Sequence, residues 1–182
     1  RMESAGLRYR TDAPEQRGAF SPHNGSGMFR FAYDSHHYQC IPGKAFSGLT
    51  RVVWELTPVK KGMGGTLLAT GSHKAAYAAP ESTQDPDSVV WETYECPAGS
   101  VMFFTEALAH STAPWTNEDN PRVSIFNLYN SVGSRWSAWN PPDELLQEMP
   151  PIRQTLFRGT YCADNLPGYR YGGQNQKDRR PL

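Results

Sequence analysis

Two side chains in this sequence are best suited to chemistry, the imidazole of His110 and the guanidinium of Arg122. His110 follows a stretch of strand-forming residues, and Arg122 opens the apolar segment 123–130. Imidazole nitrogen is a natural ligand for iron(II), and the planar fork of Arg binds a carboxylate through two parallel hydrogen bonds. On neighbouring strands of a small barrel, such a pair suits a metal ion together with a dicarboxylate.

Short strands must position these residues, because the sequence is rich in turn formers, with 15 Pro and 16 Gly, and has few segments with helical periodicity. Segment 49–56 is the strongest strand candidate, since it is β-branched and aromatic and lies between Gly48 and Pro58. We therefore predict an all-β fold, with residues 1–22 as loop. The other predicted elements are strands at 28–33, 37–40, 66–70, 89–94, 101–104 and 123–130 and one short helix at 143–148.

Length and charge restrict the class of protein. The 182 residues suit one domain, since single cores commonly serve about 100–200 residues. The chain begins on a polar stretch without an obvious first barrel element, so we expect this domain, 1–182, to be truncated at its N-terminus. Eighteen Lys and Arg balance 18 Asp and Glu, which predicts a small-molecule partner rather than nucleic acid.

Apolar runs and cysteines bear on localisation. No segment approaches the about 18 consecutive apolar residues of a membrane span, so no membrane partner is expected. Cys40, Cys96 and Cys162 lack the paired spacing of a zinc site or a disulfide framework. We expect free thiols in a soluble, cytoplasmic protein.

Several segments around the two residues belong together. They are Gly64-Gly65-Thr66-Leu67-Leu68, Gly71-Ser72-His73-Lys74, residues 96–107 (CPAGSVMFFTEA), and His110 to Trp115 followed by Arg122. Over roughly residues 20–130 this combination resembles the phytanoyl-CoA dioxygenase family. The resemblance implies a double-stranded β-helix, a jelly roll of two facing sheets, that oxidises a small substrate with Fe(II) and 2-oxoglutarate. It implies His110 as the distal iron ligand, Arg122 as the grip on the far carboxylate of 2-oxoglutarate, and Trp54 and Thr112 as the lining of the cosubstrate pocket.

The proximal iron ligand is open, because the family uses a His-x-Asp pair that this sequence lacks. Spacing counted back from the central strand points to His37, with Gln39 in the carboxylate position. His23, followed by Asn24-Gly25, instead resembles the Leu-His-Gly-Gly segment of bacterial members that also lack the aspartate. The carboxylate position is then open to Asp34 or another acid, or to a halide or water, unless metal binding is lost.

Two further residues belong to this interpretation. His73 lies in a turn near the substrate mouth, where a substrate-side or structural role is expected, and Glu106 is a candidate acceptor that orients the imidazole of His110. The predicted core contains Val53, Leu67, Val101, Phe103, Ile125 and Tyr129.

Two other functions compete with an oxygenase. A β-helix that kept a small-acid pocket around Arg122 but lost iron would be a non-catalytic binding module, which the absent aspartate supports. A zinc- or manganese-dependent cupin-like isomerase is supported by the number of histidines, five in all. The identity of the substrate depends on loops, and the sequence predicts no conformation for them.

Overall fold

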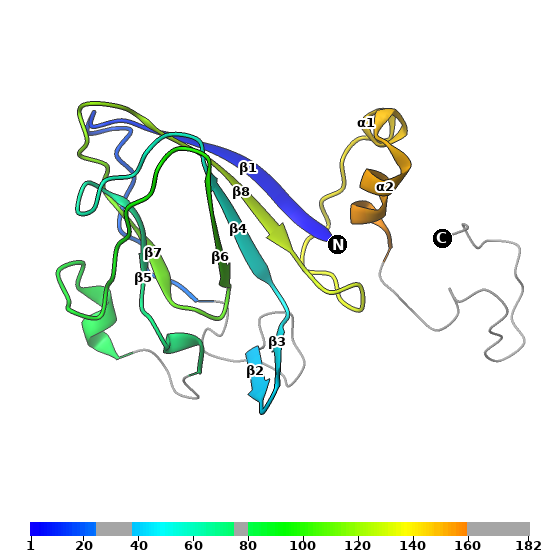
Figure 1. The fold of residues 1–182 in the computed structure, drawn as a ribbon, viewed down its shortest axis with the longest axis horizontal. Coiled ribbons are helices and arrows are strands. Elements are labelled where there is room, and N and C mark those ends of the chain that lie inside the picture. The colour runs from blue at the N-terminus through cyan, green and yellow to red at the C-terminus, as the bar shows by residue number, and fades with distance from the viewer. Residues whose placement is uncertain (25–37, 75–79, 160–182) are drawn as a thin grey trace, which may run out of the picture.

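The structure is a computed structural model that describes residues 1–24, 38–74 and 80–159. The strands of this part form a four-stranded antiparallel sheet in the order β1-β8-β4-β6, a two-stranded sheet β5-β7 and a hairpin β2-β3 (Figure 1). Their bounds are β1 Met2–Arg10, β2 Tyr38–Ile41, β3 Lys44–Ser47, β4 Thr50–Glu55, β5 Gly65–Leu68, β6 Ser100–Thr105, β7 His110–Ala113 and β8 Arg122–Tyr129.

Helical segments are short in the described part of the chain. The predicted helix at 143–148 is confirmed as α1, Asp143–Glu148, and α2, Pro151–Gln154, follows it. Single turns of 3-10 helix are η1 Ser72–Lys74, η2 Glu81–Gln84 and η3 Thr155–Phe157. None of these helices is long and apolar enough to cross a membrane.

The two sheets face each other across an apolar core. Figure 1 shows β5 and β7 on one side of the molecule and the four-stranded sheet on the other. Val53 of β4, Phe104 of β6 and Leu108 form the buried cluster, and Leu68 of β5 packs against it from the opposite sheet. This arrangement is the predicted jelly roll, with its interior between the sheets.

Alternation along β4 decides which residues reach that interior. Val53 and Glu55 are buried, whereas Trp54 between them is 42% exposed. Because successive side chains of a strand point to opposite faces, Val53 and Glu55 face the core and Trp54 faces outward. Arg51, on the same face as Val53, also points inward.

The prediction of a loop over residues 1–22 was wrong for its first half, since Met2–Arg10 forms β1 and pairs with β8 along its length. The inward positions of β1, which lie opposite Leu128, Phe126, Ser124 and Arg122, hold Ser4, Gly6, Arg8 and Arg10. An inner face without apolar side chains gives no hydrophobic alternation, so the pattern was invisible. Backbone hydrogen bonds to β8, rather than apolar side chains, hold β1 in the sheet.

The predicted strand at 89–94 was also wrong. Only Glu92 forms a bridge there, to Leu68, while Val89 is 98% exposed. The indole Nε1 of Trp91 donates to the carbonyl of Asp85, so the segment folds back on the preceding turn. A run of β-formers therefore ends as irregular chain beside β5.

The predicted core holds with one exception. Val53 and Leu67 are buried, and Val101, Ile125 and Tyr129 are half-buried. Phe103 is 68% exposed, and the following Phe104 is the inward residue. In a doublet of identical aromatics the alternation alone does not say which one faces in.

Two of the three cysteines lie in the described residues, and both Cys40 and Cys96 are free thiols, as predicted. The third, Cys162, and the predicted strand at 28–33 lie outside the described residues, as do His37 and Asp34.

Candidate active site

Two histidines from distant parts of the chain lie side by side. The backbone N–H of His23 donates to the carbonyl of His110 at 3.0 Å, and the N–H of His110 donates to the carbonyl of His23 at 2.9 Å. Residues paired in this reciprocal way project their side chains to the same side of the ladder. The two ring centroids are accordingly 4.2 Å apart.

The hydrogen bonds of the rings fix their tautomers. Nδ1 of His110 lies 2.7 Å from the carbonyl of Leu108, and Nδ1 of His23 lies 2.8 Å from the carbonyl of Ser21. A carbonyl only accepts, so both Nδ1 atoms donate and both Nε2 atoms carry the lone pair. Burial lowers the pKa of His110, although the charge of Glu106 partly opposes this shift, so the fold favours the neutral imidazole. A neutral ring anchored through Nδ1 is the form in which His binds metal ions.

The Gly-Ser motif that ends β5 holds the strand of His110 in place. Ser72 Oγ accepts from the N–H of Ala109 at 2.7 Å, and the N–H of Ala69 donates to the carbonyl of Ala109 at 2.9 Å. The ring of Phe104 meets the His110 ring edge-on, with centroids 4.9 Å apart. His110 is therefore fixed through its backbone, its Nδ1 and one ring contact. His73 in the same motif packs its ring against Tyr38 with centroids 4.6 Å apart, and its expected role stays a prediction.

A buried acid lies on the Nε2 side of His110. Glu106 accepts a hydrogen bond from Arg51 Nε on Oε1 at 2.6 Å, and its Oε2 lies 3.9 Å from His110 Nε2. We predicted that Glu106 orients the imidazole, but the carbonyl of Leu108 already binds Nδ1. Across the described ranges, no three His, Cys, Asp or Glu side chains stand ready at metal-binding spacing.

The guanidinium of Arg122 is 1% exposed and holds a carboxylate from this chain. Its Nη2 donates to Glu55 Oε1 at 2.5 Å, and its Nε donates to Glu55 Oε2 at 3.2 Å. This is the two-bond geometry in which Arg binds carboxylates most strongly. The grip of Arg122 on 2-oxoglutarate stays a prediction, and its partner in this structure, Glu55, is a residue that we had not predicted.

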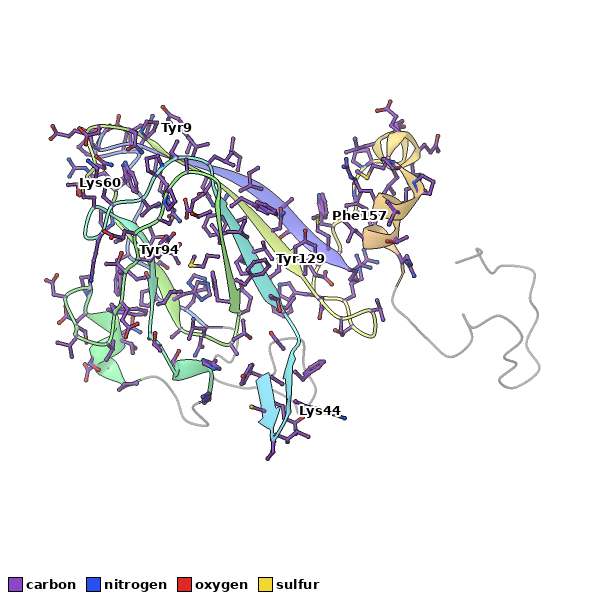
Figure 2. All side chains as sticks on the ribbon, viewed as in Figure 1. Tyr9, Lys44, Lys60, Tyr94, Tyr129 and Phe157 are labelled. Atoms are coloured by element: carbon purple, nitrogen blue, oxygen red, sulfur yellow. The ribbon has the colours of Figure 1, made fainter. Side chains whose placement is uncertain are left out.

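Two hydroxyl groups complete the surroundings of Arg122. Nη2 also lies 3.0 Å from Thr66 Oγ1 and 3.0 Å from the hydroxyl of Tyr94, which is labelled in Figure 2. The Tyr94 hydroxyl donates to Glu55 Oε1 at 2.6 Å, and burial raises the pKa of Tyr94 far above its usual value. Burial acts against the charge of Arg122, but hydrogen bonds and charge from Glu55 and Tyr94 outweigh it and raise the pKa of Arg122.

Strand β5 connects the guanidinium with the imidazoles. Thr66, which contacts Arg122, pairs with Thr112, and Leu68 pairs with His110. Residues two apart on a strand lie on the same face at a spacing of about 7 Å. The anion-binding group and the two imidazoles therefore border the same interior.

The structure brings some of the residues singled out in the sequence together and separates others. His23 meets His110, and Thr112 lies across from a contact of Arg122, whereas Trp54 points out of the interior. Gln39 lies in an exposed position of the hairpin β2-β3. The position expected of Trp54 beside Arg122 is taken by its neighbour Glu55. An acid inside an apolar strand was the signal, because a buried carboxylate requires a cationic partner.

Comparison with known proteins shows the family of this chain. A family model described as phytanoyl-CoA dioxygenase (PhyH) matches residues 8–124, more than half of the chain. Dioxygenase af480 of Aspergillus fumigatus is 30% identical over 110 residues, which make up 58% of this chain and 35% of that protein.

Two solved structures share the fold. HygX from Streptomyces hygroscopicus, with nickel and 2-oxoglutarate bound, superposes with a TM-score of 0.59 at 19% identity, over 75% of this chain and 60% of that one. The epimerase SnoN, in complex with Fe3+, alpha ketoglutarate and nogalamycin RO, superposes with a TM-score of 0.51 at 15% identity, over 88% and 60%. This chain thus spans only part of the length of each relative.

Proposed function

Because this chain belongs to the phytanoyl-CoA dioxygenase family, whose model covers residues 8–124, we propose that it is an iron(II)- and 2-oxoglutarate-dependent dioxygenase. The reaction is oxidation of a small organic substrate, by hydroxylation or a related step. One observation carries the proposal, namely that His23 and His110 are joined by two backbone hydrogen bonds, with their rings side by side and each Nδ1 on a backbone carbonyl.

The chemistry of these two side chains fits a divalent metal ion. Each Nδ1 is held by a backbone carbonyl, which leaves Nε2 as the coordinating atom without further rearrangement of the tautomer. His110 is buried, whereas His23 is exposed. In a metal site His110 would be the buried ligand and His23 the exposed ligand.

Arg122 fits the far carboxylate of a dicarboxylate cosubstrate. Glu55 already binds this guanidinium through two hydrogen bonds, so a carboxylate is stereochemically compatible with it. All hydrogen bonds that the described residues make to Arg122 use Nε or Nη2. The cosubstrate would bind through Nη1 or replace Glu55, with Thr66 and Tyr94 as additional donors.

The protein contributes geometry and exclusion of water to such a reaction. When bound, iron(II) with 2-oxoglutarate supplies the oxidising chemistry. The chain holds the imidazoles in one tautomer, anchors the cosubstrate at Arg122, and shields the interior through Val53, Phe104 and Leu108.

Anaerobic titration of the whole chain with Fe(II), followed by measurement of 2-oxoglutarate decarboxylation to succinate, tests the proposal. Micromolar metal affinity that is lost in both His23→Ala and His110→Ala, with turnover of 2-oxoglutarate in the wild type, is the expected result. His73→Ala is a matched control, since that ring packs on Tyr38 outside the imidazole pair. Absence of metal binding in the wild type would overturn the dioxygenase.

A binding module without iron is the second candidate, and one observation favours it. The described residues hold no ready group of three metal-binding side chains, while Arg122 keeps a complete anion-binding environment. A protein of this kind would bind small dicarboxylates through Arg122 with the same affinity in the presence and absence of iron. The titration separates the two, because the dioxygenase requires the metal for tight cosubstrate binding.

A further inference from the structure

We propose that Glu106 is the carboxylate ligand of the metal site, in the role that the missing His-x-Asp aspartate would have filled. The inference rests on the iron(II) site of the proposed function, to which it adds the third protein ligand. A set of two imidazoles and one carboxylate on one face of iron(II) leaves the other positions open for further ligands.

Distance is the first argument. Glu106 Oε2 lies 3.9 Å from His110 Nε2. Two atoms that bind one octahedral ion at about 2.1 Å each lie about 3 Å apart when they are adjacent. A displacement of about 1 Å, within the reach of a Glu side-chain rotation, therefore brings both atoms onto one ion.

The second argument is the side of the ring on which the acid lies. An acid that only orients a metal-binding His accepts from the ring nitrogen opposite the metal. In His110 that nitrogen is Nδ1, and the carbonyl of Leu108 already binds it at 2.7 Å. Glu106 instead approaches Nε2, the coordinating nitrogen, which is where a second ligand must lie.

The third argument is the way in which Glu106 is held. Arg51 Nε binds Oε1 at 2.6 Å and leaves Oε2 as the oxygen turned to His110. Metal-binding carboxylates in proteins are commonly hydrogen-bonded in this way through the oxygen that does not bind the metal. Glu106 and Arg51 are also attached to the core of the fold, because the N–H of Glu106 donates to the carbonyl of Leu49 beside β4.

The test compares metal affinity in five variants by anaerobic calorimetry with Fe(II), and with Co(II) as a redox-stable probe. Glu106→Gln keeps the shape and removes the ligand charge. Arg51→Met removes the hydrogen bond to Glu106 Oε1 and keeps Glu106 as the proposed ligand. Asp119→Asn removes an exposed acid that pairs with Lys60, and Asp34→Asn removes the acid nearest in sequence to His37.

We expect Arg51→Met, which removes only a hydrogen bond to the ligand, to lose metal affinity by about tenfold, and Glu106→Gln, which removes the ligand itself, to lose more than about 100-fold. Asp119→Asn and Asp34→Asn should bind the metal as the wild type does. In Glu106→Ala, added formate should restore affinity, because a small carboxylate fills the vacated position. Circular dichroism of the metal-free variants checks that each is folded.

Three results would overturn the inference. They are unchanged metal affinity in Glu106→Gln, equal losses in Glu106→Gln and Arg51→Met, which would make the acid a brace only, or a loss confined to Asp34→Asn. In each case the wild type still binds iron through His23 and His110, so the proposed function stands. If the wild type itself binds no metal, the proposed function fails first.

Discussion

The inner face of β4 carries one member of each of two buried Arg–Glu pairs, and the pairs differ in how completely they are closed. Glu55 gives both oxygens to Arg122, and the side chains of this pair are each 1% exposed. Arg51 gives one nitrogen to one oxygen of Glu106, and their side chains are 19% and 8% exposed. Val53 lies between Arg51 and Glu55 on the strand and separates the two pairs.

The difference shows how one strand serves two chemical purposes. The closed pair has hydroxyl groups from Tyr94 and Thr66 around it, so its charges are fully compensated within the protein. The open pair leaves Glu106 Oε2 without this compensation and next to an imidazole. The closed pair fixes a guanidinium, and the open pair leaves the carboxylate oxygen that we propose as a metal ligand.

The largest expected effect follows from breaking the closed pair. Arg122→Met should destabilise the fold by about 3–5 kcal/mol, because it leaves Glu55 buried without a cation. Urea unfolding of the metal-free protein measures this. The double variant Arg122→Met, Glu55→Leu should recover most of the loss, and a double variant as unstable as the single one would contradict the closed-pair description.

The open pair should tolerate the corresponding change better, and metal should compensate for it. Arg51→Met should cost about 1–2 kcal/mol, since one hydrogen bond from the partly exposed Arg51 to a charged partner is lost. Saturating Co(II) at about 100 times Kd adds about 2.7 kcal/mol to any folded protein that binds it, and should therefore bring this variant above the metal-free wild type. Thermal unfolding with and without Co(II) decides, and a metal-insensitive midpoint in Arg51→Met would refute the assignment of Oε2 to a cation.

Neutralising Glu55, the carboxylate that binds Arg122, while keeping the shape of its side chain should improve the binding of anions to Arg122. Glu55→Gln is expected to tighten 2-oxoglutarate binding several-fold, roughly 1 kcal/mol, because a like charge near the ligand disappears. Calorimetric titration with 2-oxoglutarate in the presence of Co(II) gives the constant. Weaker binding in this variant would mean that Glu55 positions Arg122 for 2-oxoglutarate rather than competing with 2-oxoglutarate for it.

The smallest effect is expected at the outward residue between the pairs. Trp54→Ala should change 2-oxoglutarate affinity less than about twofold, because the indole is exposed on the opposite face of β4 from Glu55. The same titration measures it. A tenfold loss of 2-oxoglutarate affinity would mean that Trp54 lines the cosubstrate pocket and that β4 changes its orientation when the ligand binds.

The sequence predicted what alternation and family spacing encode. The structure confirms the three strands that were predicted from apolar residues recurring with the period of a strand, at 49–56, 101–104 and 123–130. Strand β1 was missed because its inner side chains are small or charged. The partner of Arg122 was missed because β4 and β8 lie far apart in sequence, and only their register places Glu55 at that guanidinium.

The choice between His23 and His37 depended on the length of a hairpin, which spacing leaves open. The structure pairs His23 with His110 through two backbone hydrogen bonds, and such a contact between chain-distant residues has no local signature. His37 stays a prediction, since it lies outside the described residues.

The reciprocal bridge between His23 and His110 also has a topological consequence. Through it, together with the bond from the N–H of Ser21 to Ser111 Oγ, the N-terminal segment covers the free edge of the β5-β7 sheet. An uncovered edge strand is a template for pairing with other chains. An ion shared by the two imidazoles would cross-link that segment to the sheet, much as a disulfide closes a long loop. Metal loading should therefore slow amide hydrogen exchange at His23 and His110 together and lower the tendency of the protein to aggregate through this edge.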